Sequence, residues 1–301
     1  MADSEDTADP LPLGVVDNPA TTHVSVQFGA LSHRGNIRRN NEDQFIVMRR
    51  TRSRQVLLTS LSGGALSESE EVGYVMIVAD GMGGAAFGEV ASELALRTVW
   101  ALGSHGMIWP QVIDDQEVQR LLKDSDVCIQ LIHQLLQRRC EAQPEMAGMG
   151  TTLTAAYSLG TDAFIIHVGD SRAYLIRGDA IRQITRDHTL AQQLVEAGLE
   201  ASRTVAFQHV LTNCLGGDAD EVTGDVYHLP LQDGDHLLLC TDGLSDLVDE
   251  YEIQQAVHQA RHPQEACRRL VDLALERGGK DNITVVLGHY ALLNSSERPL
   301  P

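Results

Sequence analysis

The chain has 301 residues, of which 43% are hydrophobic, so it can bury a full core as one large domain or two small ones. Its net charge of −19 argues against sequence-independent binding to nucleic acid and against an anionic membrane surface as a partner. Because the longest apolar run is too short to span a bilayer and the acidic N-terminus lacks the parts of a signal peptide, we expect a cytoplasmic protein.

The first part of the chain predicts a tail followed by strands. Residues 1–22 combine acidic residues with prolines, which predicts a disordered acidic tail; the domain is expected at 23–291, with a C-terminal tail at 292–301. Strands are predicted at 24–28, 45–48, 55–59 and 73–79. The Ser-, Gly- and Glu-rich piece 61–71 predicts an exposed loop, and the whole of 49–71 is interpreted as a surface insertion rather than a partner surface.

The rest of the chain groups helices apart from strands. Helices are predicted at 88–100 and 115–139, the second with apolar residues three, four or seven positions apart. Closely spaced strands follow at 152–159, 163–168, 172–177 and 180–184, then a short helix at 189–197 and a weakly periodic surface flap at 200–217. Later elements are strands at 224–231, 236–241 and 283–290 and helices at 249–261 and 263–277. This grouping predicts an α+β sandwich with antiparallel sheets.

The stretch VADGMGG, residues 78–84, allows two interpretations. Residues 81–86 fit the loose dinucleotide-binding pattern G-x-G-x-x-[G/A] between a strand and a helix. The other interpretation takes Asp80 as a metal ligand, with the glycines bringing a backbone carbonyl close to the ion. The absence of an acidic residue between Ala95 and Ile113, where a ribose-binding acid is expected, argues against the dinucleotide site.

Aspartates occupy the ends of several predicted strands: Asp43, Asp80, Asp170, Asp242 and Asp281. A single aspartate at a strand end is most often a turn or helix-cap residue. A whole set is harder to explain in that way, because acids that converge at one sheet edge repel one another unless hard cations lie between them. Oxygen ligands of this kind favour Mg²⁺ or Mn²⁺ over zinc.

A series of motifs, in this order and spacing, resembles the metal-dependent serine/threonine protein phosphatases of type 2C. The motifs are SHRGNIRRNNEDQF (32–45), VADGMGG (78–84) followed by GEVAS (88–92), GMGTT (148–152), HVGDSRAYLIR (167–177), ITRDHTL (184–190), LCTDGLSDLV (239–248) and KDNITVV (280–286). The likeness extends from about Val24 to His289. It implies a four-layer α-β-β-α sandwich of two antiparallel sheets flanked by helices.

The resemblance also assigns roles to individual residues. It implies that two Mn²⁺ or Mg²⁺ ions are held by Asp43, Asp80, the carbonyl of Gly81, Asp242 and Asp281. Asp80 would bridge the ions, and Glu42 would reach one of them through water. Asp170 would form a third cation site with Asp242, although it could instead orient Ser171 or Arg172. Arg38 matches the phosphate-binding arginine of the family.

The implied reaction is hydrolysis of phosphoserine and phosphothreonine in proteins, by a metal-bridged hydroxide that attacks phosphorus in line. We expect a monomer, active in signalling, whose partners are phosphorylated substrates of a serine/threonine kinase. Two alternatives stay open at this point. The chain could be a non-catalytic relative that binds phosphoproteins, or a two-metal phosphatase that acts on a small phosphate compound.

Some positions depart from the family pattern or are ambiguous. Met82 stands where many eukaryotic members carry a histidine that is a candidate general acid, so the leaving-group proton is expected to come from the third cation site. His33 stands where an aspartate is usual in the family. His188 is interpreted as a helix-start residue rather than a partner of the site residues.

Overall fold

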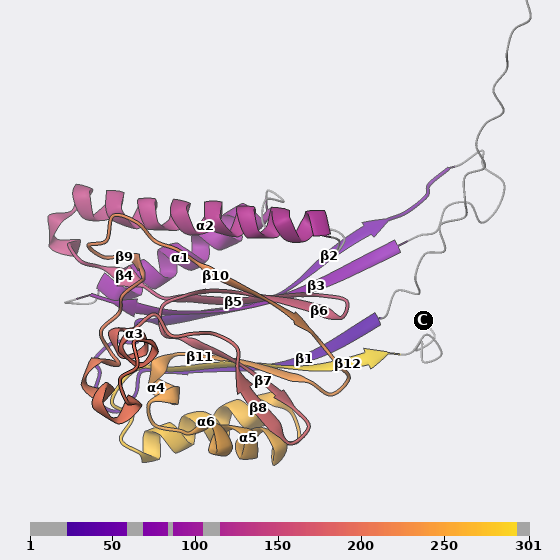
Figure 1. Cartoon of the computed structure of the whole chain (residues 1–301). Helices are drawn as coiled ribbons and strands as arrows, with labels where there is room; N and C mark the ends of the chain where they lie inside the picture. Colours follow the sequence, from indigo (N-terminus) through magenta and orange to yellow (C-terminus); the bar gives the residue numbers. More distant parts are fainter. Residues whose placement is uncertain (1–22, 59–68, 84–86, 105–114, 294–301) are drawn as a thin grey trace, which may run out of the picture.

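The computed structural model describes residues 23–58, 69–83, 87–104 and 115–293 (Figure 1). Two antiparallel sheets pack face to face between two layers of helices, which confirms the predicted four-layer α+β sandwich. The predicted N-terminal tail lies outside the described residues, as does the C-terminal tail beyond Leu293. Within the described part of the chain, no helix is long and apolar enough to cross a membrane.

The first sheet has the strand order β10-β6-β5-β3-β4-β9, and β2 pairs with β3 outside that order. Its strands are β2 Asp43–Arg54, β3 Ser69–Met82, β4 Gly150–Thr151, β5 Leu153–Leu159, β6 Asp162–Val168, β9 Leu215–Gly216 and β10 Asp225–Pro230. The second sheet has the order β1-β12-β11-β7-β8. Its strands are β1 His23–His33, β7 Arg172–Arg177, β8 Ala180–Gln183, β11 His236–Cys240 and β12 Ile283–Leu293.

Helices cover the outer face of each sheet (Figure 1). The first sheet is covered by α1 Phe87–Ser104 and α2 Asp115–Ala142, and the second by α4 Asp242–Ser245, α5 Glu250–His258 and α6 Pro263–Glu276. The connection between β8 and β9 contains α3 Leu190–Glu196 and the 3₁₀ turns η3 Ala201–Arg203 and η4 Val205–Phe207; a further 3₁₀ turn, η2 Pro144–Met146, follows α2. Residues 200–217, predicted as a flap and called the flap below, are exposed over most of 200–210.

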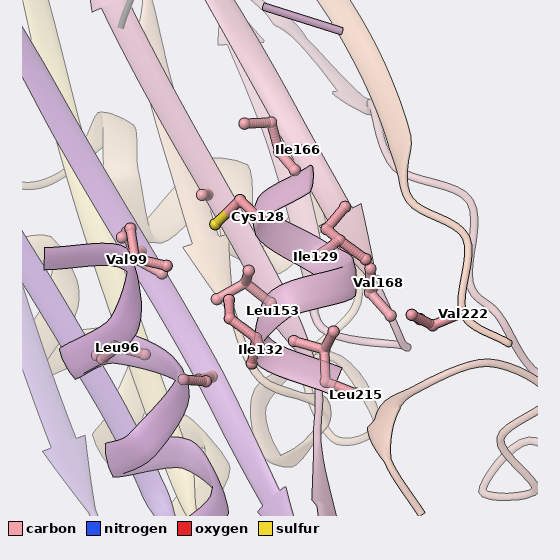
Figure 2. Close-up of a cluster of buried hydrophobic side chains, with 14 of the residues drawn as sticks. Leu96, Val99, Cys128, Ile129, Ile132, Leu153, Ile166, Val168, Leu215 and Val222 are labelled. Atoms are coloured by element: carbon pink, nitrogen blue, oxygen red, sulfur yellow. The ribbon is translucent and has the colours of Figure 1, made fainter. Parts of the chain in front are cut away.

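Strand β3 shows why the predicted strand 73–79 is apolar throughout. Met76 and Val78 point into the core between the two sheets, whereas Val75, Ile77 and Ala79 pack beneath α1 and α2. Both faces of the strand are therefore buried, so the period-two alternation of a half-exposed strand is absent. Figure 2 shows the outer cluster, in which side chains of α1 and α2 meet Leu153, Ile166 and Val168 of the sheet.

The prediction of an exposed loop at 61–71 was wrong at its end, because residues 69–71 belong to β3. Strands β2 and β3 form a paired ribbon from Asp43 opposite Asp80 to Arg54 opposite Ser69. The prediction of a strand at 55–59 was also wrong for the described residues 55–58, which follow the end of β2 and form no strand. Charged side chains conceal this pairing in the sequence, but opposite charges such as those of Arg52 and Glu71 face each other across it. The described part of the ribbon extends away from the sandwich (Figure 1), and residues 59–68 lie outside the described part of the chain.

Truncation of Ile77, which is fully buried under α1 and α2, tests the packing of the outer cluster. We expect Ile77→Ala to lower the free energy of unfolding by about 2–5 kcal/mol, because it removes buried methyl groups and leaves a cavity. Denaturant unfolding measures the change. Leu58→Ala is the control, since Leu58 is 96% exposed and its truncation should have little effect; equal losses in both variants would contradict this packing.

Candidate metal centre

Two of the predicted acids face each other at one end of the β2–β3 pair. Asp43 is the first residue of β2, and its Cα partner on β3 is Asp80. The backbone around Asp80 is fixed from the next strands, because its N–H donates to the hydroxyl of Thr152 at 2.9 Å and its carbonyl accepts from the hydroxyl of Thr151 at 2.9 Å. Sheet pairing thus brings the two carboxylates together without help from a loop.

The glycines after Asp80 allow two backbones to approach each other. A Cβ on Gly81 would lie 2.1 Å from the carbonyl oxygen of Gly88, and a Cβ on Gly88 would lie 2.5 Å from the carbonyl oxygen of Gly81. The N–H of Gly81 also donates to the carbonyl of Glu42 at 3.2 Å. Neither position can carry a side chain, which gives the glycines a packing reason and leaves the backbone of Gly81 lining a pocket.

The second sheet contributes Asp242 and Asp281. Asp242 begins α4 directly after β11, where the preceding Thr241 donates its hydroxyl to Oδ2 of Asp43 at 2.9 Å. Asp281 precedes β12, and its Oδ2 accepts from Nη2 of Arg38 at 2.5 Å. Arg38 and Asp281 are both partly exposed, so this ion pair lies at the mouth of the pocket.

The side chain of Asn282 forms hydrogen bonds that hold the segment carrying Arg38 and Glu42. Its Nδ2 donates to the carbonyls of Arg34 and Asn40, at 2.9 and 2.8 Å, and its Oδ1 accepts from the N–H of Glu42 at 2.8 Å. The side chain is buried, so all of its hydrogen-bonding groups are used to hold this loop. Sequence reasoning missed Asn282, although its position directly after Asp281 in the motif KDNITVV was a signal.

The structure brings most of the predicted site residues into one pocket of about 590 Å³. The pocket is lined by Arg38, Glu42, Asp80, Gly81, Asp170, Asp242 and Asp281, with Met82, Gln208, His209 and Asp246 among the other lining residues. Asp43 lies buried beside it. Strand ends from both sheets and the flap therefore meet at this pocket.

Burial raises the pKa values of three of these acids, Asp43, Asp80 and Asp170. Burial raises the pKa of Asp43 to about 7, and the carboxylates of Asp242 and Asp281 add to the rise. Burial, followed by the neighbouring carboxylates, also holds the pKa values of Asp80 and Asp170 well above their usual range. These groups favour the protonated form because each negative charge is desolvated and surrounded by others.

The side chains fit a pair of hard cations. Oδ1 of Asp43 and Oδ1 of Asp242 are buried, and no described group donates a hydrogen bond to either atom. Buried carboxylate oxygens without a donor are costly unless a cation binds them. The donor set consists of carboxylates and the backbone of Gly81, which suits Mg²⁺ or Mn²⁺ rather than zinc.

His209 and Asp246 are pocket residues that sequence reasoning missed. Nδ1 of His209 lies 3.8 Å from an oxygen of Asp242 and 3.5 Å from an oxygen of Asp246, and their ligand atoms are close enough to hold a cation together. Asp242 and Asp246 raise the pKa of His209 to about 9, through charge attraction across distances longer than a good hydrogen bond. Asp246 follows Asp242 by one helical turn, a spacing that could have indicated it.

The structure also places the three residues that departed from the family pattern or were ambiguous in the sequence, Met82, His33 and His188. Met82 lines the pocket and provides no proton donor there. Nδ1 of His33 accepts from the N–H of Gly35 at 3.0 Å, so His33 orders its own turn. The interpretation of His188 as the helix-start residue was wrong: Thr189 caps α3, accepting from the N–H of Gln192, and the buried His188 ring points into a polar network.

Comparison with known proteins identifies the family. A model of the protein phosphatase 2C family matches residues 64–276. The serine/threonine phosphatase Stp of Listeria innocua is 34% identical over 84% of this chain and 92% of its own length. PstP, a serine/threonine protein phosphatase of Mycobacterium tuberculosis, is also 34% identical, over 89% of this chain and 46% of its own length.

Solved structures agree. The PstP catalytic domain, described in complex with two manganese ions, superposes with a TM-score of 0.69 and 31% identity over 89% of this chain and 100% of that one. A serine/threonine phosphatase of S. agalactiae gives a TM-score of 0.72 and 28% identity over the same shares. The chain therefore belongs to the protein phosphatase 2C family. This confirms the resemblance and the enzyme class, serine/threonine protein phosphatase, predicted from the motifs; the dinucleotide interpretation of 81–86 was wrong.

The raised pKa of Asp43 predicts how stability depends on pH when divalent ions are removed. The folded state holds the Asp43 proton more tightly than the unfolded chain does. The contribution of this proton to the free energy of unfolding is therefore full below about pH 4 and is lost as the pH rises through about 7. In EDTA, Asp43→Asn should therefore become more stable relative to the wild type between pH 5 and pH 8, by on the order of 1–3 kcal/mol.

Denaturant unfolding at both pH values measures this difference. Asp179→Asn, in the exposed turn between β7 and β8, is the matched control and should show no such trend. A stability difference for Asp43→Asn that stays constant from pH 5 to pH 8 would contradict the assigned charge cluster.

Proposed function

We propose that this protein hydrolyses phosphoserine and phosphothreonine in proteins, in a reaction that depends on divalent metal ions. The observation that carries the proposal is the meeting of Asp43, Asp80, Asp242 and Asp281 around one pocket, with buried carboxylate oxygens that lack a donor. Family membership and the two manganese ions described for PstP support the same chemistry. The catalytic domain would be residues 23–291.

The acids would hold two Mn²⁺ or Mg²⁺ ions, with the backbone of Gly81 as a further ligand and Glu42 in contact through water. When bound, such ions lower the pKa of water and balance the charge of the phosphoryl oxygens. Asp170 and Asp242 would hold a third ion. This set accounts for all the carboxylates that line the pocket except Asp246, which would assist at the third position.

Arg38 would bind the phosphoryl group. Its guanidinium lies at the pocket mouth, where Asp281 orients it, and a planar guanidinium can donate two parallel hydrogen bonds to a phosphoryl group. The leaving serine or threonine oxygen would face the flap, because Gln208, His209 and Leu211 line the pocket on that side.

The substrates would be phosphoproteins made by a serine/threonine kinase, which the names of the relatives support. Presence of the expected acids argues against a non-catalytic relative. We further propose that the protein acts in signalling, in the cytoplasm and as a monomer.

Hydrolysis of a phosphothreonine peptide tests this function. We expect turnover with Mn²⁺, no turnover with EDTA, and a loss of at least about a hundredfold in Asp242→Asn, because a ligand shared between ions is removed. Asp179→Asn is the matched control and should keep full activity. Tight Mn²⁺ binding without peptide hydrolysis would contradict the proposal and favour a small phosphate compound or a binding role.

Arg38→Ala tests the phosphate-binding role. We expect KM for the phosphopeptide to rise about tenfold or more, since a charge-assisted contact with the phosphoryl group is lost. Steady-state kinetics measure the effect, with Arg39→Ala as the control because Arg39 is its exposed neighbour and lies outside the pocket. Equal effects of the two variants would contradict a specific contact by Arg38.

A further inference from the structure

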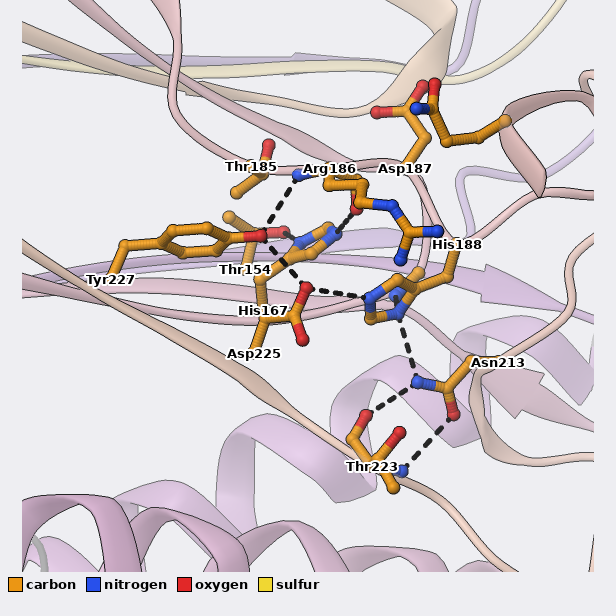
Figure 3. Close-up of polar contacts among 12 residues, drawn as sticks. Thr154, His167, Thr185, Arg186, Asp187, His188, Asn213, Thr223, Asp225 and Tyr227 are labelled. Atoms are coloured by element: carbon orange, nitrogen blue, oxygen red, sulfur yellow. Dashed lines mark hydrogen bonds and ion pairs between the residues drawn. The ribbon is translucent and has the colours of Figure 1, made fainter. Parts of the chain in front are cut away.

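Figure 3 shows a polar network in which the buried ring of His188 lies between Asp225 and Asn213. Gly169, which directly precedes Asp170, is bonded to His188 twice. Its N–H donates to Nδ1 of the ring at 3.1 Å, and its carbonyl accepts from the backbone N–H of His188 at 2.7 Å. His188 thus bonds both backbone polar groups of Gly169, the residue directly before Asp170.

The turn at Gly169 leaves little freedom to compensate if these bonds are lost. Gly169 has a φ of +110°, and a Cβ at this position would lie 2.5 Å from Cγ2 of Thr152. The turn is therefore packed against Thr152, whose hydroxyl also accepts from the N–H of Asp80. A shift of this turn would move the Asp170 carboxylate directly.

His188 also holds the base of the flap. Its carbonyl accepts from the N–H of Thr212 at 2.8 Å, and the side-chain amide of Asn213 donates to Nδ1 of the ring at 3.0 Å. The same amide donates to the carbonyl of Thr223 at 2.6 Å. Beside this contact, Leu211 pairs with Thr189 and lines the pocket, so the base of the flap joins the turn of Asp170 through a single residue.

The partners of the ring define its tautomer. Because Nδ1 accepts from two N–H groups, the proton of the neutral ring lies on Nε2 and points to Oδ2 of Asp225, 3.2 Å away. The same oxygen of Asp225 accepts from the hydroxyl of Tyr227 at 2.9 Å. Asp225 of β10 therefore sets the orientation of the ring, as Figure 3 shows, and Nδ1 remains an acceptor for both Gly169 and Asn213.

We propose that His188 is a positioning residue that holds the turn of Asp170 and the base of the flap in one fixed relation. The effect of His188 on catalysis rests on the proposed function, because Asp170 and the flap both line the pocket. The effect of His188 on the position of the flap is independent of that function. The essential group is the Nδ1 acceptor, since only this atom contacts both segments.

Paired substitutions separate the two ring nitrogens. His188→Asn places a side-chain oxygen near the position of Nδ1 and gives up the bond to Asp225, whereas His188→Gln reaches the position of Nε2 and leaves Gly169 without its acceptor. We expect His188→Gln to lose about tenfold to a hundredfold in kcat/KM with a phosphopeptide, because the Asp170 turn shifts. His188→Asn should stay within about threefold of the wild type.

A second readout uses the flap itself and needs no metal. Arg203 lies in the flap with its side chain 77% exposed, so trypsin can report on the flap in EDTA. We expect cleavage after Arg203, identified by mass spectrometry, to be several-fold faster in His188→Gln than in the wild type or His188→Asn. His228→Asn is the matched control. His228 lies on β10, like Asp225, but its ring pairs with Asp162 of β6 and not with the Asp170 turn or the flap.

The outcomes distinguish the possibilities. If both His188 variants lose activity and gain cleavage only in proportion to a fall in thermal stability, His188 is an ordinary core residue and the proposal is overturned. Equal behaviour of the two variants at full stability would also overturn it. If the wild type itself hydrolyses no phosphopeptide, the proposed function fails, while the cleavage experiment still decides the role of His188.

Discussion

The structure depends on one electrostatic constraint: several carboxylates must lie close together, partly buried, although they repel one another. Desolvation and mutual repulsion raise the pKa values of Asp43, Asp80 and Asp170, so the cluster opposes folding until a counter-charge is present. A flexible loop would relieve this repulsion by moving apart. The acids must therefore be attached to elements that cannot move, and the sandwich provides them.

The two-sheet sandwich holds the acids in place mainly with backbone contacts rather than with opposite charges. Asp43 and Asp80 are register partners in one sheet, and Gly81 packs directly against Gly88 at the start of α1. In the other sheet, the hydroxyl of Thr241 accepts from the N–H of Thr284 at 3.0 Å and donates to Asp43. The hydrophobic core between the sheets holds these two halves in fixed relation. Arg38 is the exception, since it pairs with Asp281 in solvent-exposed surroundings.

Much of this arrangement could be predicted from the sequence. Apolar runs that end at or just before an aspartate identified β3, β6 and β11 and, at the same time, the pocket acids Asp80, Asp170 and Asp242, because strand ends and site residues coincide here. The pairing of residues 49–54 with the start of β3 was missed because strands exposed on both sides carry charged residues such as Arg52 and Glu71, whose stabilising partner is known only once the register is known.

The remaining omissions share a different cause. His188, His209 and Asn282 act on residues far away in the sequence, and no local periodicity records such contacts. His188 was misinterpreted because it directly precedes a helix, which is also where a capping residue stands; only the fold shows that Thr189 caps α3 and that the imidazole faces Gly169. Composition and spacing indicate which residues carry chemistry, but long-range hydrogen bonds show which residues hold them in place.

The strand order of the second sheet has a consequence for synthesis of the protein. Strand β1, the first described element, pairs in its sheet with β12, the last, and β12 then pairs with β11. During translation β1 must remain without its partner strand until β12 has left the ribosome, and such non-local pairing is slow and leaves strand edges open to aggregation. Asp281 emerges just before β12, so the nascent chain completes its charge cluster and its second sheet in the same late step. A chain that ends before β12 would lack the strand that joins β1 to β11, so its second sheet would be interrupted.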